Sequence, residues 1–422
     1  MNTMEMVHFL ASDEGFGALV RPYGDQASSQ ALRYMHLVEQ HKAHFGEKPS
    51  LKICSAPGRC EIAGNHTDHN NGRVLAAAIN LDTIAAVSPN DNNAVTLYSE
   101  GYDHPFIVDL SDLSIRPDER ETTAALIRGV AARLNELGIS VGGFDAVVTS
   151  SVLKGSGLSS SAAFEVMLCQ IFSALYAADF DVQELARIAQ YAENVYFGKP
   201  SGLLDQMASA VGGLVAMDFQ SSPATVDPIA YDFEARGYRL VVVSAGGDHG
   251  NLTDQYAAIP AEMKMVAHAL SGTVLRDVDY DVMIEHLPEL KRTVPDRAIL
   301  RAFHFYNENQ RVSRLVQALK HNDMPAFLKG IIASGDSSWE LLQNLYVPGS
   351  ANQELALALE LSRRLLKDNG AWRIHGGGFA GTILAFVPIS ELETYTQQLN
   401  SVFGANACTP LQVRPIGPYT LG

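Results

Sequence analysis

The sequence predicts a two-domain protein of α+β (mixed α/β) architecture, and three observations lead to this fold class. The chain has 422 residues, and at about 100–200 residues per domain this length indicates two domains. Apolar residues make up 47% and charged residues 18%, which is a globular composition with enough material for a core. Strand-like and helical segments are mixed in both halves, so each half is expected to be an α/β or α+β unit.

The first half begins with helices and continues with strands. Apolar residues at helical spacing indicate helices, and alternating or continuous apolar runs indicate strands. The first strand is expected to end at Pro57-Gly58. The predicted helices are 26–44, 122–137, 162–178 and 182–195, and the predicted strands are 51–56, 74–87, 94–99 and 144–149.

A segment rich in serine and proline, residues 219–230, predicts the boundary between the two domains. The first domain then spans 1–222 and the second 223–422. In the second domain the predicted strands are 238–244 and 383–388, and the predicted helices are 256–270, 312–319 and 352–369.

The net charge of −16 argues against non-specific binding of nucleic acid or of an anionic membrane. To bind a phosphorylated ligand, such an acidic chain would need a local group that attracts the phosphate, such as a helix N-terminus, a metal or one suitably placed arginine. No apolar run approaches the ~18 residues of a membrane span, and residues 1–15 lack the basic start of a signal peptide. The four cysteines form no CxxC pair and are expected to be reduced. We expect a cytoplasmic protein that is a monomer or a weak oligomer.

The most informative stretch runs from Val152 to Val166 and contains Gly155, Gly157 and three serines that open a helix. Glycines let backbone N–H groups turn inward, and a helix N-terminus offers free donors at a positive dipole end. Serine hydroxyls add donors, and one can bind Mg²⁺. An ordinary capped helix is the plainer alternative, but three serines exceed what a cap needs, which favours phosphate binding. Gly198-Lys199 lacks a P-loop context, and the GxGxxG of 376–381 leads into a strand instead of a helix.

Two further stretches carry polar groups suited to chemistry. The glycine-punctuated loop 57–72 contains Arg, Asn, His and Asp side chains that together satisfy the hydroxyls of a polyol. A metal site at 66–69 and a solvated turn are the weaker alternatives. Glu193 and Asp205 form an acidic pair, and Asp205 lies among apolar neighbours. A buried carboxylate with a cationic partner is suited to act as a base or a metal ligand.

Taken together, these stretches resemble the galactokinase family of the GHMP kinase superfamily. Residues 58–68 resemble its signature GRxNxIGEHTDY, 155–163 its ATP loop, 192–206 its catalytic segment and 376–381 its third, glycine-rich motif. The motifs occur in the family's order over most of the chain. The resemblance implies a two-domain GHMP-kinase-like fold with the active site in the cleft between the domains. It also implies a left-handed βαβ crossover around the phosphate loop, which periodicity cannot show.

The resemblance further implies ATP- and Mg²⁺-dependent phosphorylation of a sugar at its anomeric C1 hydroxyl, with conversion of galactose to galactose 1-phosphate as the expected reaction. Alternatives are a kinase of another pyranose such as galacturonate, or a non-catalytic regulator that binds sugar and ATP. Asp205 would be the base and Arg59 its partner at the transferring phosphoryl group. The remaining implied roles are Ser161 and Glu193 for Mg²⁺; Gly155, Ser156, Gly157, Leu158, Ser159, Ser160 and Ser161 for ATP; and Asn65, His66, Asp68, Gly202 and Tyr256 for the sugar.

The chain departs from the family pattern at several positions, and two of them lie in the second half of the signature. Asn65 stands where the signature has glutamate, and His69 where it has tyrosine. A glutamate repels a carboxylate at C6 of the sugar, whereas an asparagine also donates a hydrogen bond. We therefore hypothesise that Asn65 lets the enzyme tolerate C6-oxidised sugars.

Overall fold

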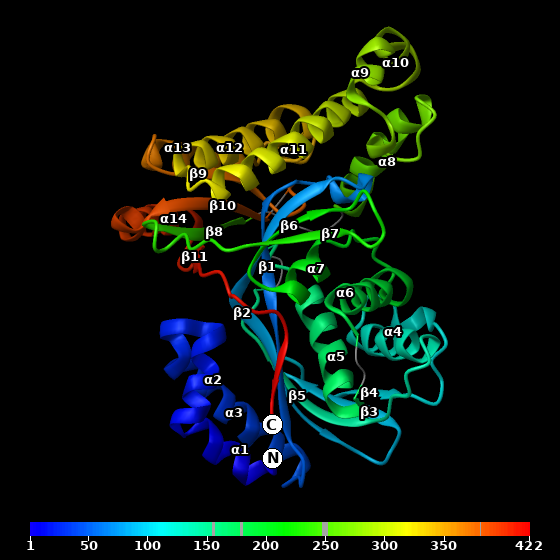
Figure 1. The fold of residues 1–422 in the computed structure, drawn as a ribbon, viewed down its shortest axis with the longest axis vertical. Coiled ribbons are helices and arrows are strands. Elements are labelled where there is room, and N and C mark those ends of the chain that lie inside the picture. The colour runs from blue at the N-terminus through cyan, green and yellow to red at the C-terminus, as the bar shows by residue number, and fades with distance from the viewer. Residues whose placement is uncertain (154–156, 178–179, 247–251, 380) are drawn as a thin grey trace.

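The structure, a computed structural model, describes residues 1–153, 157–177, 180–246, 252–379 and 381–422. Within these residues, two β-sheets are joined by one long strand pair (Figure 1). The larger sheet has the order β12-β1-β2-β5-β3-β4, with β6 paired to β2 and β7 paired to β6. The smaller sheet has the order β11-β8-β10-β9 and is antiparallel throughout.

The central strands of the larger sheet are buried on both faces, because they place apolar side chains alternately against two sets of helices. Ile53, Ile84 and Val147 face the N-terminal helices, whereas their neighbours Cys54, Ala85 and Val148 face α4–α7. The strands are β1 (Lys52–Ala63), β2 (Arg73–Pro89), β3 (Ala94–Ser99), β4 (Phe106–Asp109), β5 (Phe144–Ser150), β6 (Leu214–Asp218), β7 (Thr225–Ile229) and β12 (Tyr419–Leu421). The helices are α1 (Thr3–Leu10), α2 (Asp13–Tyr23), α3 (Ala27–Phe45), α4 (Thr123–Glu136), α5 (Ser160–Tyr176), α6 (Val182–Tyr191), the π-helix η4 (Ala192–Phe197) and α7 (Leu204–Val211).

The smaller sheet shares one core with the β1–β2 pair. Leu240 and Phe386 pack with residues of that pair and of α11 and α12, whereas Val241 and Ala385 pack with α13 and α14. The strands are β8 (Tyr238–Gly246), β9 (Ala371–His375), β10 (Gly381–Pro388) and β11 (Cys408–Leu411). The helices are α8 (Thr253–Ala269), α9 (Tyr280–Glu285), α10 (Leu287–Thr293), α11 (Asp296–Lys320), α12 (Met324–Ser337), the π-helix η6 (Ser338–Leu342), α13 (Glu354–Leu366) and α14 (Leu392–Phe403).

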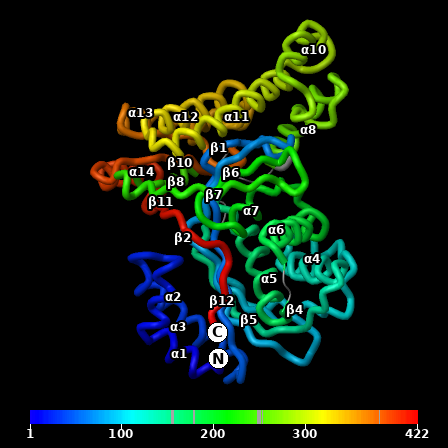
Figure 2. Tube along the Cα trace, viewed as in Figure 1, coloured from blue at the N-terminus to red at the C-terminus, as the bar shows by residue number. Residues whose placement is uncertain are grey.

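A buried charge network fastens the N-terminal helices to the larger sheet. The Asp82 carboxylate on β2 pairs with Arg33 of α3 at 2.5 Å and with Arg414 at 3.0 Å. It also accepts hydrogen bonds from Ser55 and Tyr23. Arg414 precedes β12, which returns to pair with β1, so the two chain termini lie close together (Figure 2). The network thus joins both ends of the chain to the centre of the sheet.

The predicted elements are largely confirmed, with corrections that matter for the site. The predicted first strand does not end at Pro57-Gly58, because β1 runs on to Ala63. A register shift between Pro57 and Arg59 allows this, since a bulge tolerates the missing N–H of proline. The predicted helix 312–319 is part of the much longer α11, and α12 was not predicted.

The segment 219–230 contains β7, which pairs with β6 in the larger sheet. The larger sheet therefore takes strands from both sides of the predicted division at 222, and that division stays a prediction. No helix in the described ranges has both the length and the apolar character needed to cross a membrane.

Candidate active site

An arginine and an aspartate face each other at the centre of a cavity of about 390 Å³. Arg59 extends from β1 and Asp205 from the first turn of α7, and Arg59 Nε lies 2.7 Å from Asp205 Oδ1. Burial by itself raises the pKa of Asp205, but the Arg59 guanidinium and the Ser159 hydroxyl outweigh it and hold the pKa below its ordinary range. Asp205 is therefore ionised at neutral pH.

The start of α5 forms the adjoining wall of this cavity. Ser159 is the N-cap residue and has φ +56°, a left-handed conformation that is uncommon outside glycine and typical of functional turns. Gly157 also has positive φ, and a Cβ there would lie 3.0 Å from both His375 and Thr382. Arg59 Nη1 donates to the Gly157 carbonyl. The same guanidinium thus holds the carboxylate and the loop before α5, whose first turn directs free N–H groups outward.

A second carboxylate lies on the helix side of the loop. The π-helix η4 places Glu193 so that its Oε1 accepts from Ser161 Oγ at 3.0 Å and from Lys199 Nζ at 3.0 Å. Its Oε2 accepts from Gln206 Nε2 at 2.8 Å. Widened π turns occur frequently at functional sites, because they redirect one side chain. A hydroxyl and a carboxylate oxygen side by side are the hard ligands that Mg²⁺ prefers.

Glu165 is linked to the Glu193 carboxylate through the side-chain amide of Gln206. It is fully buried one turn after Ser161 on α5, and its Oε2 accepts from the other hydrogen of Gln206 Nε2 at 3.0 Å. Burial and, next, the nearby Glu193 raise the pKa of Glu165 well above its ordinary range. The Gln206 amide therefore bridges two acidic side chains and fixes the orientation of Glu193.

The loop between β1 and β2 supplies the opposite side of the cavity. His66 donates from Nε2 to the Gly377 carbonyl at 3.1 Å. Burial, with a smaller contribution from His69, lowers the pKa of His66 to about 3, so its ring is neutral and its Nδ1 is an acceptor. A Cβ on Gly202 would lie 1.8 Å from Asp68 Oδ2, so only glycine lets this carboxylate approach the α7 turn. Tyr256 of α8 donates to the Gly378 carbonyl at 3.0 Å and borders the same space.

The structure brings most of the sequence-predicted residues to this one cavity. Those that line it are Arg59, His66, Asp68, Gly157, Ser159, Ser160, Ser161, Gly202, Asp205 and Tyr256. Glu193 adjoins it through Ser161. Leu158 is buried, and its carbonyl accepts from Arg59 N at 3.1 Å. Gly155 and Ser156 lie outside the described residues.

Asn65, which was predicted to bind the sugar, does not line the cavity. Its side-chain amide donates to Glu61 at 3.0 Å and to the Gly376 carbonyl at 2.8 Å, and its oxygen accepts from Asn344 at 2.8 Å. Only 1% of the residue is exposed. The hypothesis that Asn65 touches the C6 substituent therefore has no contact to support it in the described part of the chain.

Sequence reasoning missed Glu61, Lys199, His375 and Thr382, all of which line the cavity. Glu61 could have been found if the first strand had been extended past Pro57, because residues two apart on a strand share a face. No local pattern marked Lys199. Among the described residues, no three or more His, Cys, Asp or Glu side chains are grouped to hold a metal, which gives no support to the alternative metal site at 66–69.

Fold and site together define a small-molecule kinase of the GHMP superfamily, and residues 125–213 match the GHMP kinase N-terminal domain. The galactokinase galactose-binding signature matches residues 39–89, and the galactokinases of Actinobacillus pleuropneumoniae serotype 5b and Streptomyces coelicolor are each 32% identical to the chain. The chain belongs to the galactokinase family.

The alignments with the two relatives cover most of both chains. The Actinobacillus relative aligns over 84% of this chain and 90% of its own length, and the Streptomyces relative over 87% and 92%. The crystal structure of Lactococcus lactis galactokinase complexed with galactose superposes with a TM-score of 0.80 at 22% identity, over 91% of this chain and 98% of that one. The Methanococcus jannaschii mevalonate kinase superposes with a TM-score of 0.63 at 16% identity, over 87% and 99%. The predicted fold class is confirmed.

Proposed function

We propose that this chain transfers the γ-phosphoryl group of ATP to the anomeric C1 hydroxyl of galactose, with Asp205 as the base. The observation that carries the proposal is the position of Asp205. Its carboxylate, held by Arg59 and Ser159, lies between the N-terminus of α5 and the 64–69 loop, in one cavity. A phosphate on the α5 side and a hydroxyl on the loop side would meet at this carboxylate.

The nucleotide side of the cavity suits a triphosphate. Backbone N–H groups at the start of α5 and the hydroxyls of Ser159, Ser160 and Ser161 offer donors without adding positive charge to an acidic chain. The paired oxygens of Ser161 and Glu193 fit Mg²⁺, which characteristically takes one or two protein ligands and completes its shell with phosphate and water. Bound there, the ion would neutralise charge on the phosphates.

On the sugar side, Asp68 and His66 would accept hydrogen bonds from sugar hydroxyls. Asp205 would take the proton of the anomeric hydroxyl as that oxygen forms its bond to the γ-phosphorus. The bond between this phosphorus and the bridging oxygen breaks, and ADP leaves with the electron pair. Arg59 lies against both the base and the loop, so it would stabilise charge on the transferring group. Such a transfer depends mainly on alignment and charge stabilisation.

The test is sugar- and ATP-dependent ADP release over a panel of free hexoses, pentoses and uronic acids, with sugar-free reactions as blanks. The product is then analysed for phosphate at C1. Galactose is expected to give the highest kcat/KM. Absence of sugar-dependent turnover, together with intact sugar and ATP binding, would favour the non-catalytic regulator, and a phosphate at any other carbon would refute the proposed chemistry.

A further inference from the structure

Another carboxylate, that of Glu61, lines the cavity and has no role in the proposed transfer. Glu61 lies two residues after Arg59 on β1, in a stretch where pairing with β2 is regular from Arg59 to Glu61. Side chains two apart on a strand point to the same face, and both Arg59 and Glu61 line the cavity. Cys60 between them points into the core shared by the two sheets.

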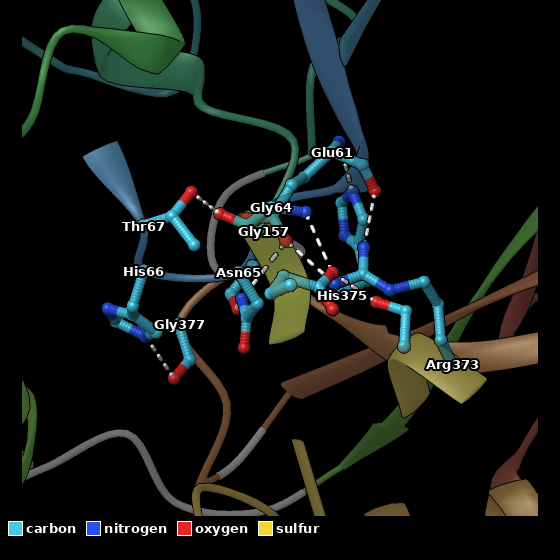
Figure 3. A network of polar contacts seen from close by, with 12 residues as sticks. Glu61, Gly64, Asn65, His66, Thr67, Gly157, Arg373, His375 and Gly377 are labelled. Atoms are coloured by element: carbon cyan, nitrogen blue, oxygen red, sulfur yellow. Dashed lines mark hydrogen bonds and ion pairs between the residues drawn. The ribbon is translucent and has the colours of Figure 1, made fainter. Parts of the chain in front are cut away.

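One oxygen of Glu61 is held by the protein. Oε1 accepts from Arg373 Nη2 at 2.9 Å and from Asn65 Nδ2 at 3.0 Å. Arg373 comes from β9 of the other sheet, is completely buried, and also donates from Nη1 to the Glu61 carbonyl at 2.9 Å. Figure 3 shows Glu61, Asn65 and Arg373 gathered in this network. The backbone N–H of Glu61 donates to His375 Nε2 at 3.2 Å. These contacts fix the carboxylate on both its side chain and its backbone.

The other oxygen is left for a ligand. Glu61 Oε2 has no hydrogen-bond partner within the described ranges, and the side chain is 7% exposed. Burial raises the pKa of the Glu61 carboxyl, and the Arg373 guanidinium opposes this effect because it donates to the carboxylate and favours the charged form. In that form the carboxylate accepts hydrogen bonds but donates none. A buried acceptor with one unused oxygen on a cavity wall is suited to a hydroxyl and unsuited to an anion, because like charges repel strongly where water is scarce.

Asn65 explains how this arrangement is kept in place. All of its side-chain hydrogen bonds are made to protein groups, one of them to the Glu61 oxygen that also accepts from Arg373. Asn65 therefore acts on the sugar through the groups it holds, Glu61 and Gly376, both of which line the cavity. The glutamate that the family signature has at position 65 is absent here, and a carboxylate four residues earlier borders the cavity in this chain.

We propose that Glu61 Oε2 accepts a hydrogen bond from one hydroxyl of the sugar, and that this carboxylate restricts the substrate to uncharged sugars. This inference rests on the proposed function for the sugar side of the cavity. It reverses the expectation drawn from Asn65 alone, because the group that meets the substrate is an anion. Glu61 is a binding and specificity residue and takes no part in proton transfer.

The test is a double-mutant cycle between Glu61→Gln and single hydroxyls of the sugar. Binding by calorimetry and kcat/KM by ADP release are measured for galactose, its 2-, 3-, 4- and 6-deoxy derivatives and galacturonate. For the wild type, removal of one particular hydroxyl is expected to weaken binding about 10–100-fold, as for a hydrogen bond to a charged group. Glu61→Gln is expected to bind galactose more weakly than the wild type by a similar factor. Removal of that one hydroxyl from the sugar is expected to cause no further loss of binding in this variant. Galacturonate is expected to bind the wild type about 100-fold more weakly than galactose, and Glu61→Gln is expected to narrow that gap.

Two variants guard against a merely structural effect. Glu119→Gln is the matched control, because Glu119 is also an arginine-paired carboxylate, held by the buried Arg128, and does not line the cavity. Glu119→Gln is expected to leave the ratios among the sugars unchanged. If Glu61→Gln does not fold, Glu61→Asp keeps a charge beside Arg373 but withdraws the acceptor, and it is expected to show the same loss of sensitivity to one hydroxyl.

The outcomes separate this inference from the proposed function. The inference is overturned, and the proposed function is left intact, if the wild type phosphorylates galactose but the Glu61 variants lower the affinity and kcat/KM for every sugar by one common factor. A wild type that binds galactose with the Glu61-dependent pattern but releases no ADP supports the inference and overturns the function. A wild type that binds and phosphorylates no sugar overturns both.

Discussion

Replacing Asp205 by asparagine tests the centre of the proposed chemistry. The substitution keeps the size of the side chain and removes its charge and its ability to accept a proton. General base catalysis contributes about 10²–10⁴-fold to a rate. Because Arg59 and Ser159 hold the pKa of Asp205 below its ordinary range, the carboxylate would be a weak base and would act largely by orienting the hydroxyl. We therefore expect kcat to fall about 10²–10³-fold, which corresponds to ~2.7–4.1 kcal/mol of transition-state stabilisation.

The assay separates chemistry from binding and folding. ADP release dependent on ATP and galactose gives kcat and KM, calorimetry gives sugar affinity, and thermal unfolding reports the fold. Ser159→Ala is the control, because it removes one hydrogen bond to Asp205 and leaves the charge in place. A single hydrogen bond to a charged group contributes about 1.5–3 kcal/mol, so this control is expected to lose less kcat than Asp205→Asn.

The pH dependence follows from the same contacts. A carboxylate with a lowered pKa stays ionised above about pH 4 and is lost as a base only as the pH falls below that value. The wild-type kcat should therefore not decline between pH 8 and pH 5 through protonation of this group. The reasoning is refuted if Asp205→Asn keeps kcat within about threefold of the wild type, or if its kcat loss comes entirely from lost sugar binding.

Three further predictions concern the metal ligand, the sugar loop and the N-terminal network. Glu193→Gln should raise the Mg²⁺ concentration needed for half-maximal binding of ATP about tenfold or more, measured by calorimetry. Glu184→Gln on α6 is the control and should not change this concentration. Equal values for the two variants would contradict the proposal that Glu193 binds Mg²⁺. Gly202→Ala places a Cβ against Asp68 and should raise the KM for sugar about 10–100-fold. Gly17→Ala is the control and should leave KM unchanged, because no atom lies within 4 Å of the added Cβ. An unchanged KM in Gly202→Ala would count against Asp68 as a sugar ligand. Asp82→Asn leaves buried arginines unpaired and should lower the free energy of unfolding by about 3–5 kcal/mol, or about 3–6 °C in Tm if the chain unfolds as one unit at ~2.1 cal/mol/K per residue. Burial raises the pKa of Asp82, but Arg33 and Arg414 outweigh it and hold the pKa below its ordinary range. The stabilisation is therefore present above about pH 4 and is lost as the pH falls through the lowered pKa. A Tm difference between wild type and variant that changes between pH 8 and pH 5 would contradict this account.

Local patterns in the sequence predicted several elements of the site, but they did not predict α7 or the second half of β1. Helical spacing predicted α4 and α5, and apolar runs predicted β2 and β8, because each buries a face with its own period. Glycines and serines at 155–161 predicted the phosphate loop, since few other local roles need so many donors and so little side chain. The carboxylates of Glu193 and Asp205 were identified from their neighbours along the chain.

Only the tertiary structure decided which groups face the cavity. Pro57 concealed the continuation of β1, because the bulge that accommodates it depends on the register with β2. Glu61 became a cavity residue, and Asn65 a support for it, through Arg373, Gly376 and Asn344, which are about 280–310 residues away in sequence. Side-chain direction at such positions is set by partners from other elements, and a linear pattern does not contain that information. The class of chemistry could therefore be predicted from local sequence patterns, whereas packing between the two sheets determined which carboxylates line the cavity.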